Sequence, residues 1–160
     1  KPMVLDADGL NLLASHASSD MQISVITPHP GEAARLLGCD VVEIQKDRFA
    51  SVRRLAEKFD CVAVLKGAGT LVADPRGQVA LCPFGNPGMA SAGMGDLLTG
   101  VIAGLLAQGM SPWDSACLGV LAHAVSGDRA AQGRPRGLLA SDLLLPLRDC
   151  VNGAVACAHE

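Results

Sequence analysis

A glycine-rich stretch that runs directly into an apolar segment most constrains what this chain can fold into. Residues 85–96 contain four glycines, one proline and a single charge, that of Asp96, and residues 97–106 are the most apolar part of the sequence. A flexible loop that opens a buried helix presents free backbone N–H groups and the positive end of the helix dipole to an anion. An acid at the helix start adds proton chemistry beside that anion. We therefore predict an anion site with Asp96 as a candidate catalytic acid or base, the alternative being a connection required only by close packing.

Length and composition predict one folded domain over residues 1–160 and exclude several function classes. The chain is 49% hydrophobic and 18% charged, and its length suffices for a sizeable core. A net charge of −3, with scattered arginines that lack aromatic neighbours, argues against nucleic-acid binding. The longest apolar run, residues 97–107, is too short to cross a membrane. The six cysteines form no metal-binding pattern, so we expect them to act as small apolar side chains in a reducing, cytoplasmic compartment.

Short apolar runs alternate with longer amphipathic stretches, which predicts a mostly parallel sheet flanked by helices. The helix over 9–16 is expected to be capped by Asp8, the helix over 43–59 to expose Arg48 to solvent, and the last helix to be kinked at Pro146. Because the first residues already read as a strand, we expect the chain to be part of a longer domain. The predicted strands are 3–5, 23–26, 62–65, 71–73 and 78–81, the last two joined by a turn at 74–77, and the predicted helices are 9–16, 32–37, 43–59, one from the glycine loop to 108, 111–131 and 141–150.

Four polar clusters fall where predicted strands end or helices begin, which is where the active sites of parallel sheets form. Asp6 and Asp8 have the ordinary interpretation of turn and cap residues, although a carboxylate there could hold a metal-bound water. His29 and Glu32 have the spacing of a metal pair, but Pro30 and the following glycine argue against a preformed helical arrangement. The other two clusters are residues 66–70 and 93–96.

The segment Lys66–Thr70 is small and rich in hydrogen-bond donors. It fits either a contact with the phosphates or sugar of a nucleotide or a tight turn between two strands. Neither this segment nor Gly93–Gly95 matches the P-loop or the dinucleotide-binding glycine pattern.

Residues 86–100, Asn-Pro-Gly-Met-Ala-Ser-Ala-Gly-Met-Gly-Asp-Leu-Leu-Thr-Gly, closely resemble the signature of the ADP/ATP-dependent NAD(P)H-hydrate dehydratases, which belong to the ribokinase-like superfamily. Residues 5–11, 27–32 and 65–70 agree with the same family in the same order. The resemblance implies a ribokinase-like three-layer sandwich with a mostly parallel central sheet, of which this chain is the C-terminal portion, truncated at the N-terminus.

The resemblance also implies a repair reaction. Hydrated NADH or NADPH is dehydrated back to the reduced cofactor at the expense of ADP or ATP with Mg²⁺, through phosphorylation of the ring hydroxyl and loss of phosphate. We further expect a homo-oligomer and, in the parent protein, fusion to an NAD(P)H-hydrate epimerase domain.

The family's functional positions carry over to individual residues of this chain. Asp96 would take the hydroxyl proton, and with His29 it would bind the hydrated nicotinamide. Glu32 would support magnesium through water. Gly93, Met94 and Gly95 would form the anion hole, and the nucleotide would be bound by Lys66, Gly67, Ala68, Gly69, Thr70 and Gly95.

Two alternatives remain open on the sequence. One is a small-molecule kinase of the same fold that acts on a vitamin precursor, and the other is a non-catalytic nucleotide-binding fragment. The kinases of this superfamily usually carry asparagine where His29 stands, which favours the dehydratase, and alanine where Met94 stands.

Overall fold

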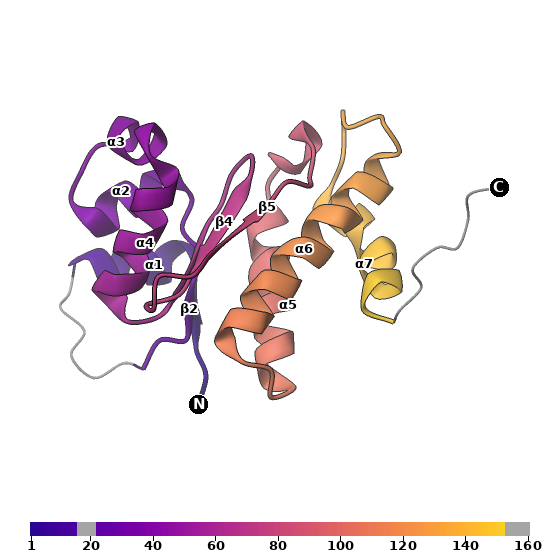
Figure 1. The fold of residues 1–160 in the computed structure, drawn as a ribbon. Coiled ribbons are helices and arrows are strands. Elements are labelled where there is room, and N and C mark those ends of the chain that lie inside the picture. The colour runs from indigo at the N-terminus through magenta and orange to yellow at the C-terminus, as the bar shows by residue number, and fades with distance from the viewer. Residues whose placement is uncertain (16–21, 153–160) are drawn as a thin grey trace.

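The computed structural model describes residues 1–15 and 22–152, which form a five-stranded sheet between two groups of helices (Figure 1). The strands lie in chain order, from β1 to β5, and the first three pair in parallel. An antiparallel hairpin completes the sheet, so that only β4 runs against the others. The expected mostly parallel α/β sheet is therefore confirmed. The strands are β1 (Val4–Leu5), β2 (Val25–Ile26), β3 (Val62–Leu65), β4 (Thr70–Ala73) and β5 (Val79–Cys82).

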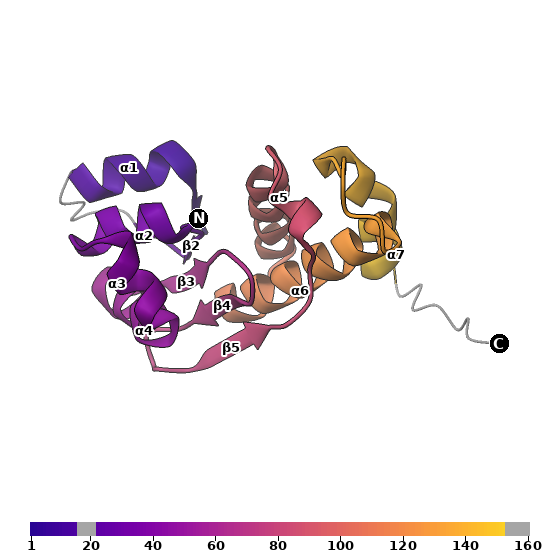
Figure 2. The same cartoon turned by 90° about the horizontal axis from the view of Figure 1, so that it is seen from above.

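The helices cover both faces of the sheet, as Figure 2 shows from above. One group packs on the first face and consists of α1 (Ala7–Ser15), α2 (Pro30–Leu37), α3 (Val41–Lys46) and α4 (Arg48–Phe59). The other face is covered by α5 (Met94–Ala107) and α6 (Pro112–Ala131), with α7 (Leu144–Val151) packed on α6. Two 3₁₀ turns, η1 (Pro87–Met89) and η2 (Ala140–Leu143), complete the chain order.

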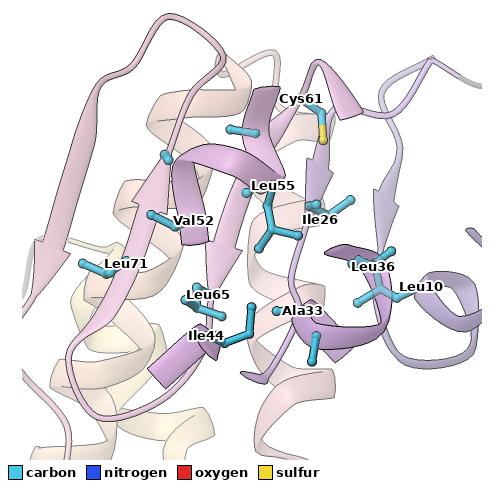
Figure 3. Close-up of a cluster of buried hydrophobic side chains, with 14 of the residues drawn as sticks. Leu10, Ile26, Ala33, Leu36, Ile44, Val52, Leu55, Cys61, Leu65 and Leu71 are labelled. Atoms are coloured by element: carbon cyan, nitrogen blue, oxygen red, sulfur yellow. The ribbon is translucent and has the colours of Figure 1, made fainter. Parts of the chain in front are cut away.

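Two hydrophobic cores, one on each face of the sheet, establish the three layers. Alternate residues of β3 point to opposite faces, so Ala63 and Leu65 pack with α1, α2 and α4 (Figure 3). Val62 and Val64 pack instead with α5 and α6. A strand that is buried on both faces needs apolar residues at every position, which explains the continuous apolar run at 62–65.

The single helix predicted over residues 43–59 is wrong, because the chain breaks between α3 and α4 at Asp47. Asp47 has non-helical backbone angles, and its side chain accepts a hydrogen bond from the N–H of Ala50 at 2.9 Å. A capping aspartate accepts a hydrogen bond from a free N–H group of the new helix, so the break costs little folding free energy.

Two other helix predictions need correction. Helix α1 begins at Ala7, so Asp8 lies in its first turn instead of capping it, and the expected end at His16 lies outside the described residues. The segment expected as one helix over 141–150 forms η2 and then α7. Pro146 is the third residue of α7, where a missing N–H costs no intrahelical bond, so the helix continues through it.

The five cysteines within the described ranges are free thiols, and two of them, Cys61 and Cys82, are buried. Burial raises the pKa of Cys61 to about 12 and that of Cys117 to about 11, so both stay protonated and act as apolar filling. None of the helices in residues 1–15 and 22–152 has the length and apolarity that a membrane crossing requires.

Candidate functional site

An ion pair at the carboxyl ends of two strands forms the centre of the site. Asp6 follows β1 and Lys66 follows β3, and Lys66 Nζ lies 2.7 Å from Asp6 Oδ1. Thr99 of α5 donates a hydrogen bond to the other oxygen, Asp6 Oδ2, at 2.8 Å. From the sequence, Asp6 was expected to be an ordinary turn residue, or else a carboxylate that holds a metal-bound water. Its partners lie 60 and 93 residues away along the chain, so only the folded sheet reveals its place in the site.

The charge of Asp6 is stabilised by these partners. Burial alone would raise the pKa of the carboxyl, but the hydrogen bonds from Lys66 and Thr99 and the positive charge of Lys66 outweigh burial, so the pKa lies below its ordinary value. Asp6 is therefore a carboxylate at neutral pH, and it holds the Lys66 ammonium in place.

His29 and Glu32 form a capping box at the start of α2. His29 Nδ1 accepts hydrogen bonds from the N–H groups of Gly31 and Glu32, and Glu32 Oε2 accepts one from the N–H of His29 at 2.7 Å. Helix α2 begins at Pro30, so the expectation that Pro30 and Gly31 oppose a helical arrangement of the pair is wrong. Proline is favoured in the first turn of a helix because its missing N–H has no partner there.

Glu32 links this cap to the ion pair. Its carboxylate is buried, and Glu32 Oε2 lies 3.8 Å from Lys66 Nζ, while Oε1 lies 3.4 Å from His29 Nε2. Lys66 thus stands between two carboxylates, which leaves the cluster with one net negative charge when His29 is neutral. Within residues 1–15 and 22–152 no three histidine, cysteine or acidic side chains gather as a metal site.

The N-terminus of α5 lies against this cluster. Gly93 precedes the helix in the left-handed conformation (φ +84°), which favours glycine, and no side chain caps the helix. The N–H groups of Met94, Gly95 and Asp96 therefore have no intrahelical acceptor. A Cβ atom at Gly95 would lie 3.4 Å from Lys66 Nζ and 3.7 Å from Asp6 Oδ2, so the first turn of α5 lies close to the ion pair.

Arg48 of α4 holds the segment that follows β3, residues 66–70. The guanidinium donates hydrogen bonds to the carbonyls of Leu65 (3.2 Å), Lys66 (3.3 Å) and Ala68 (2.5 Å). Burial lowers the pKa of Arg48. The expectation that Arg48 faces solvent is therefore wrong. The residue is the first of α4, and the break at Asp47 turns it toward the loop.

The loop before α5 is fixed to α6 by Asp128. Asp128 Oδ2 accepts a hydrogen bond from the N–H of Gly85 at 2.9 Å, and Oδ1 accepts one from Asn86 Nδ2 at 3.0 Å. Met89 lies on Gly127 so closely that a Cβ atom there would come within 2.3 Å of the Met89 sulfur. These contacts hold the glycine-rich loop, residues 85–93, against α6.

These two loops, together with α5 and α6, line an open cavity of about 520 Å³. All six residues expected to bind a nucleotide, Lys66 to Thr70 and Gly95, line it, and so does Met94 of the expected anion hole. The described lining does not include Gly93, Asp96, His29 or Glu32. Asp96 is exposed as the third residue of α5, so the two expected substrate residues lie outside the cavity.

The cavity also reveals His123, which sequence reasoning missed. His123 lies on α6 and is only 8% exposed, and burial lowers its pKa to about 4 although a hydrogen bond to the Met94 backbone opposes the shift. A lone histidine within an apolar helix is more often a core residue, so its sequence context gave no functional signal.

The fold and the site define a class of protein, the ribokinase-like α/β proteins. A solved structure from Enterococcus faecalis V583, described as a ribokinase-like superfamily protein, superposes with a TM-score of 0.77 at 27% identity, over 93% of this chain and 52% of that one. The ADP/ATP-dependent NAD(P)H-hydrate dehydratase from Bacillus subtilis, co-crystallised with ATP/Mg²⁺ and soaked with CoA, superposes with a TM-score of 0.84 at 33% identity, over 95% of this chain and 56% of that one.

Sequence comparison identifies the family within this class. The profile of the NAD(P)H-hydrate dehydratase family matches residues 1–147, and the chain belongs to this family. The Escherichia coli bifunctional NAD(P)H-hydrate repair enzyme is 52% identical over 97% of the chain, and the ADP-dependent (S)-NAD(P)H-hydrate dehydratase of Neisseria meningitidis is 43% identical over 89%. The chain spans 30% of the first relative and 51% of the second. The kinase alternative is not favoured.

Proposed function

We propose that this chain supplies the nucleotide site and the catalytic base of an enzyme that dehydrates hydrated NADH and NADPH at the expense of ADP or ATP. The observation that carries the proposal is that Lys66–Thr70 and Gly95 line one cavity, which meets the uncapped N-terminus of the helix that bears Asp96. An anion site and an acid are thereby adjacent on one element.

The nucleotide would occupy the cavity with its terminal phosphoryl group at the first turn of α5. The N–H groups of Gly93, Met94 and Gly95 would hold the phosphoryl oxygens. Lys66 Nζ, fixed by Asp6 at 2.7 Å, would neutralise charge that develops there during transfer. Because these donors are already in place, little reorganisation is needed when the reaction occurs.

Asp96 would act as the base on the substrate side of this turn. It would take the proton from the ring hydroxyl while that oxygen attacks the terminal phosphorus, and the nucleotide would leave one phosphate shorter. The phosphorylated ring would then lose phosphate as its C–O bond breaks, and loss of a proton from the neighbouring carbon would restore the ring double bond. Phosphate is a far better leaving group than hydroxide, which explains why a nucleotide is consumed.

His29 would bind the hydrated nicotinamide through the exposed part of its ring, because Nδ1 is engaged in the cap of α2 and Nε2 lies 3.4 Å from Glu32 Oε1. Mg²⁺ typically binds one or two carboxylates, water and substrate phosphates. The residues present fit only this limited arrangement, in which Glu32 supports the ion through water. Bound there, Mg²⁺ would neutralise phosphate charge.

The parent protein is proposed to resemble the bifunctional relatives, with residues 1–160 forming one domain, the C-terminal portion of the dehydratase domain, beside an NAD(P)H-hydrate epimerase domain. We propose also that it is cytoplasmic and homo-oligomeric. Light scattering of the full-length protein measures the oligomer, and a monomer would contradict that part of the proposal.

The reaction is tested by incubating the full-length protein with hydrated NADH and Mg²⁺, with ADP and ATP in parallel. Recovery of the reduced-nicotinamide absorbance with one of the nucleotides is expected, and reactions without nucleotide are the control. No recovery with either nucleotide would overturn the proposal, as would a stable phosphorylated product.

A further inference from the structure

Phe84 places a large apolar side chain at the wall of the cavity, where the proposed chemistry gives it no role. It lies two residues after β5, lines the cavity beside Pro83 and is 53% exposed. Large aromatic residues are rare in this chain, which has three phenylalanines, one tryptophan and no tyrosine. Among the described residues that line the cavity, Phe84 is the only one of these four.

The backbone on both sides of Phe84 is held in place. Cys82 ends β5, is buried in the core and pairs with Thr70 in the hairpin ladder. On the other side, the N–H of Gly85 donates a hydrogen bond to Asp128 Oδ2 at 2.9 Å. The exposed side chain is thus carried by a segment that is fixed to the sheet and to α6. A ligand that packs on it therefore loses little affinity to the ordering of this loop.

The register of the sheet sets the distance from Phe84 to the proposed phosphate site. Leu65, Leu71 and Leu81 lie side by side in β3, β4 and β5, which Figure 2 shows as neighbours. Because adjacent strands are about 4.8 Å apart, the ends of β3 and β5 are separated by about 10 Å. Lys66 follows β3 and Phe84 follows β5, so both lie at the same edge of the sheet. A nucleotide spans this separation when its terminal phosphate lies at Lys66 and its base at Phe84.

The chemistry of the lining agrees with this placement. Lys66 and the first turn of α5 supply a cation and N–H donors for the phosphates, whereas Phe84, Val120 and Ala124 supply apolar surface. A nucleobase is flat and gains stacking energy on an aromatic side chain, since every base has a π-face. An exposed phenylalanine on a fixed backbone is suited to this contact.

We propose that Phe84 stacks on the nucleobase of the bound ADP or ATP. The base is then recognised through its flat face, and the phosphates are held independently at Lys66 and α5. This inference rests on the proposed function, because it takes the cavity to be the nucleotide site.

Calorimetry of the full-length protein with ADP and with ATP measures the contribution of the ring. For the nucleotide that the wild type binds, Phe84→Ala is expected to weaken the affinity ~5–100-fold, the range for the loss of one stacked base. Phe84→Trp keeps an aromatic face and should stay within ~3-fold of the wild type. Phe49→Ala is the matched control and should also stay within ~3-fold, because Phe49 is 46% exposed on α4 and is not part of the described cavity lining.

Fluorescence gives a readout that a merely structural role of Phe84 would not produce. The emission that Phe84→Trp adds to that of the wild type should be quenched when the nucleotide stacks on the indole. Inorganic pyrophosphate has no base and should leave this emission unchanged.

Three results would overturn the stacking role while the nucleotide site stands. They are equal affinities of Phe84→Ala and Phe49→Ala, an indole emission that the bound nucleotide leaves unchanged, and equal quenching by pyrophosphate and nucleotide. Failure of the wild type to bind either ADP or ATP would overturn the proposed function together with this inference.

Discussion

Asp96 is the residue on which the proposed chemistry depends most, and its position separates catalysis from binding. It is exposed at the start of α5 and does not line the cavity. Asp96→Asn in the full-length protein should therefore lower kcat by ~10²–10⁴-fold, the usual contribution of a general base. The KM for the nucleotide should stay within ~3-fold of the wild-type value, because Asp96 does not contribute to the lining of the nucleotide cavity.

Steady-state kinetics measures both constants, and Asp8→Asn is the matched control. Asp8 is an exposed carboxylate in the first turn of α1, so its replacement should change neither constant. An Asp96→Asn enzyme with near-wild-type kcat would exclude Asp96 as the base.

His123 makes stability depend on pH in a definite direction. Its pKa is about 4 in the folded protein against 6.5 ordinarily, so the unfolded chain binds a proton that the folded chain does not as pH falls below 6.5. The stabilisation from keeping this ring neutral is complete above pH 6.5 and is lost as pH falls toward 4. Denaturant titrations across this window should show a loss of up to about 3 kcal/mol in the unfolding free energy.

The comparison that isolates His123 is the same titration of His123→Phe, which cannot take up the proton. Its unfolding free energy should fall much less between these pH values. Parallel pH profiles of the two proteins would show that another group is responsible.

Among the elements, the loop after β3 and the start of α4 act as a unit. Arg48 holds three loop carbonyls, so Arg48→Met should loosen the nucleotide loop without touching the acid on α5. We expect the nucleotide KM to rise ~10-fold with kcat within ~3-fold, which corresponds to a loss of about 1.4 kcal/mol of binding.

Arg53→Met is the matched control for Arg48→Met, since Arg53 is exposed on the same helix. Equal effects of the two variants, or a fall in kcat alone for Arg48→Met, would count against the loop-holding role.

Some helices and strands could be predicted from local sequence, and others could not. Strands such as Val62–Leu65 and the hairpin β4–β5 were predicted because apolar runs and turn residues act locally. The break at Asp47 was not, because the helical pattern continues through it and only the cap and the loop contacts of Arg48 favour two helices. His29 was misjudged because proline was taken to oppose a helix that it in fact begins.

In the whole molecule, long-range pairing explains what the sequence could not predict. The glycine loop and the nucleotide segment were predicted as parts of one site, and both line one cavity. Thr99 and Asp128 were missed, and Asp6 was named as a candidate without its partners, because each has a partner 42 or more residues away, which no local pattern encodes. Sequence patterns therefore predicted most of the elements, and the family resemblance placed the two loops in one site, whereas the residues that fix those loops needed the fold.

The central claim is that a nucleotide phosphoryl group, held at the start of α5, is consumed in each dehydration. The most direct measurement is the stoichiometry of the full-length enzyme, with NADH recovered and nucleotide converted determined in the same reaction. The account predicts one nucleotide converted and one phosphate released for each NADH formed. NADH recovered without nucleotide conversion would contradict it, and so would nucleotide converted while a phosphorylated substrate accumulates.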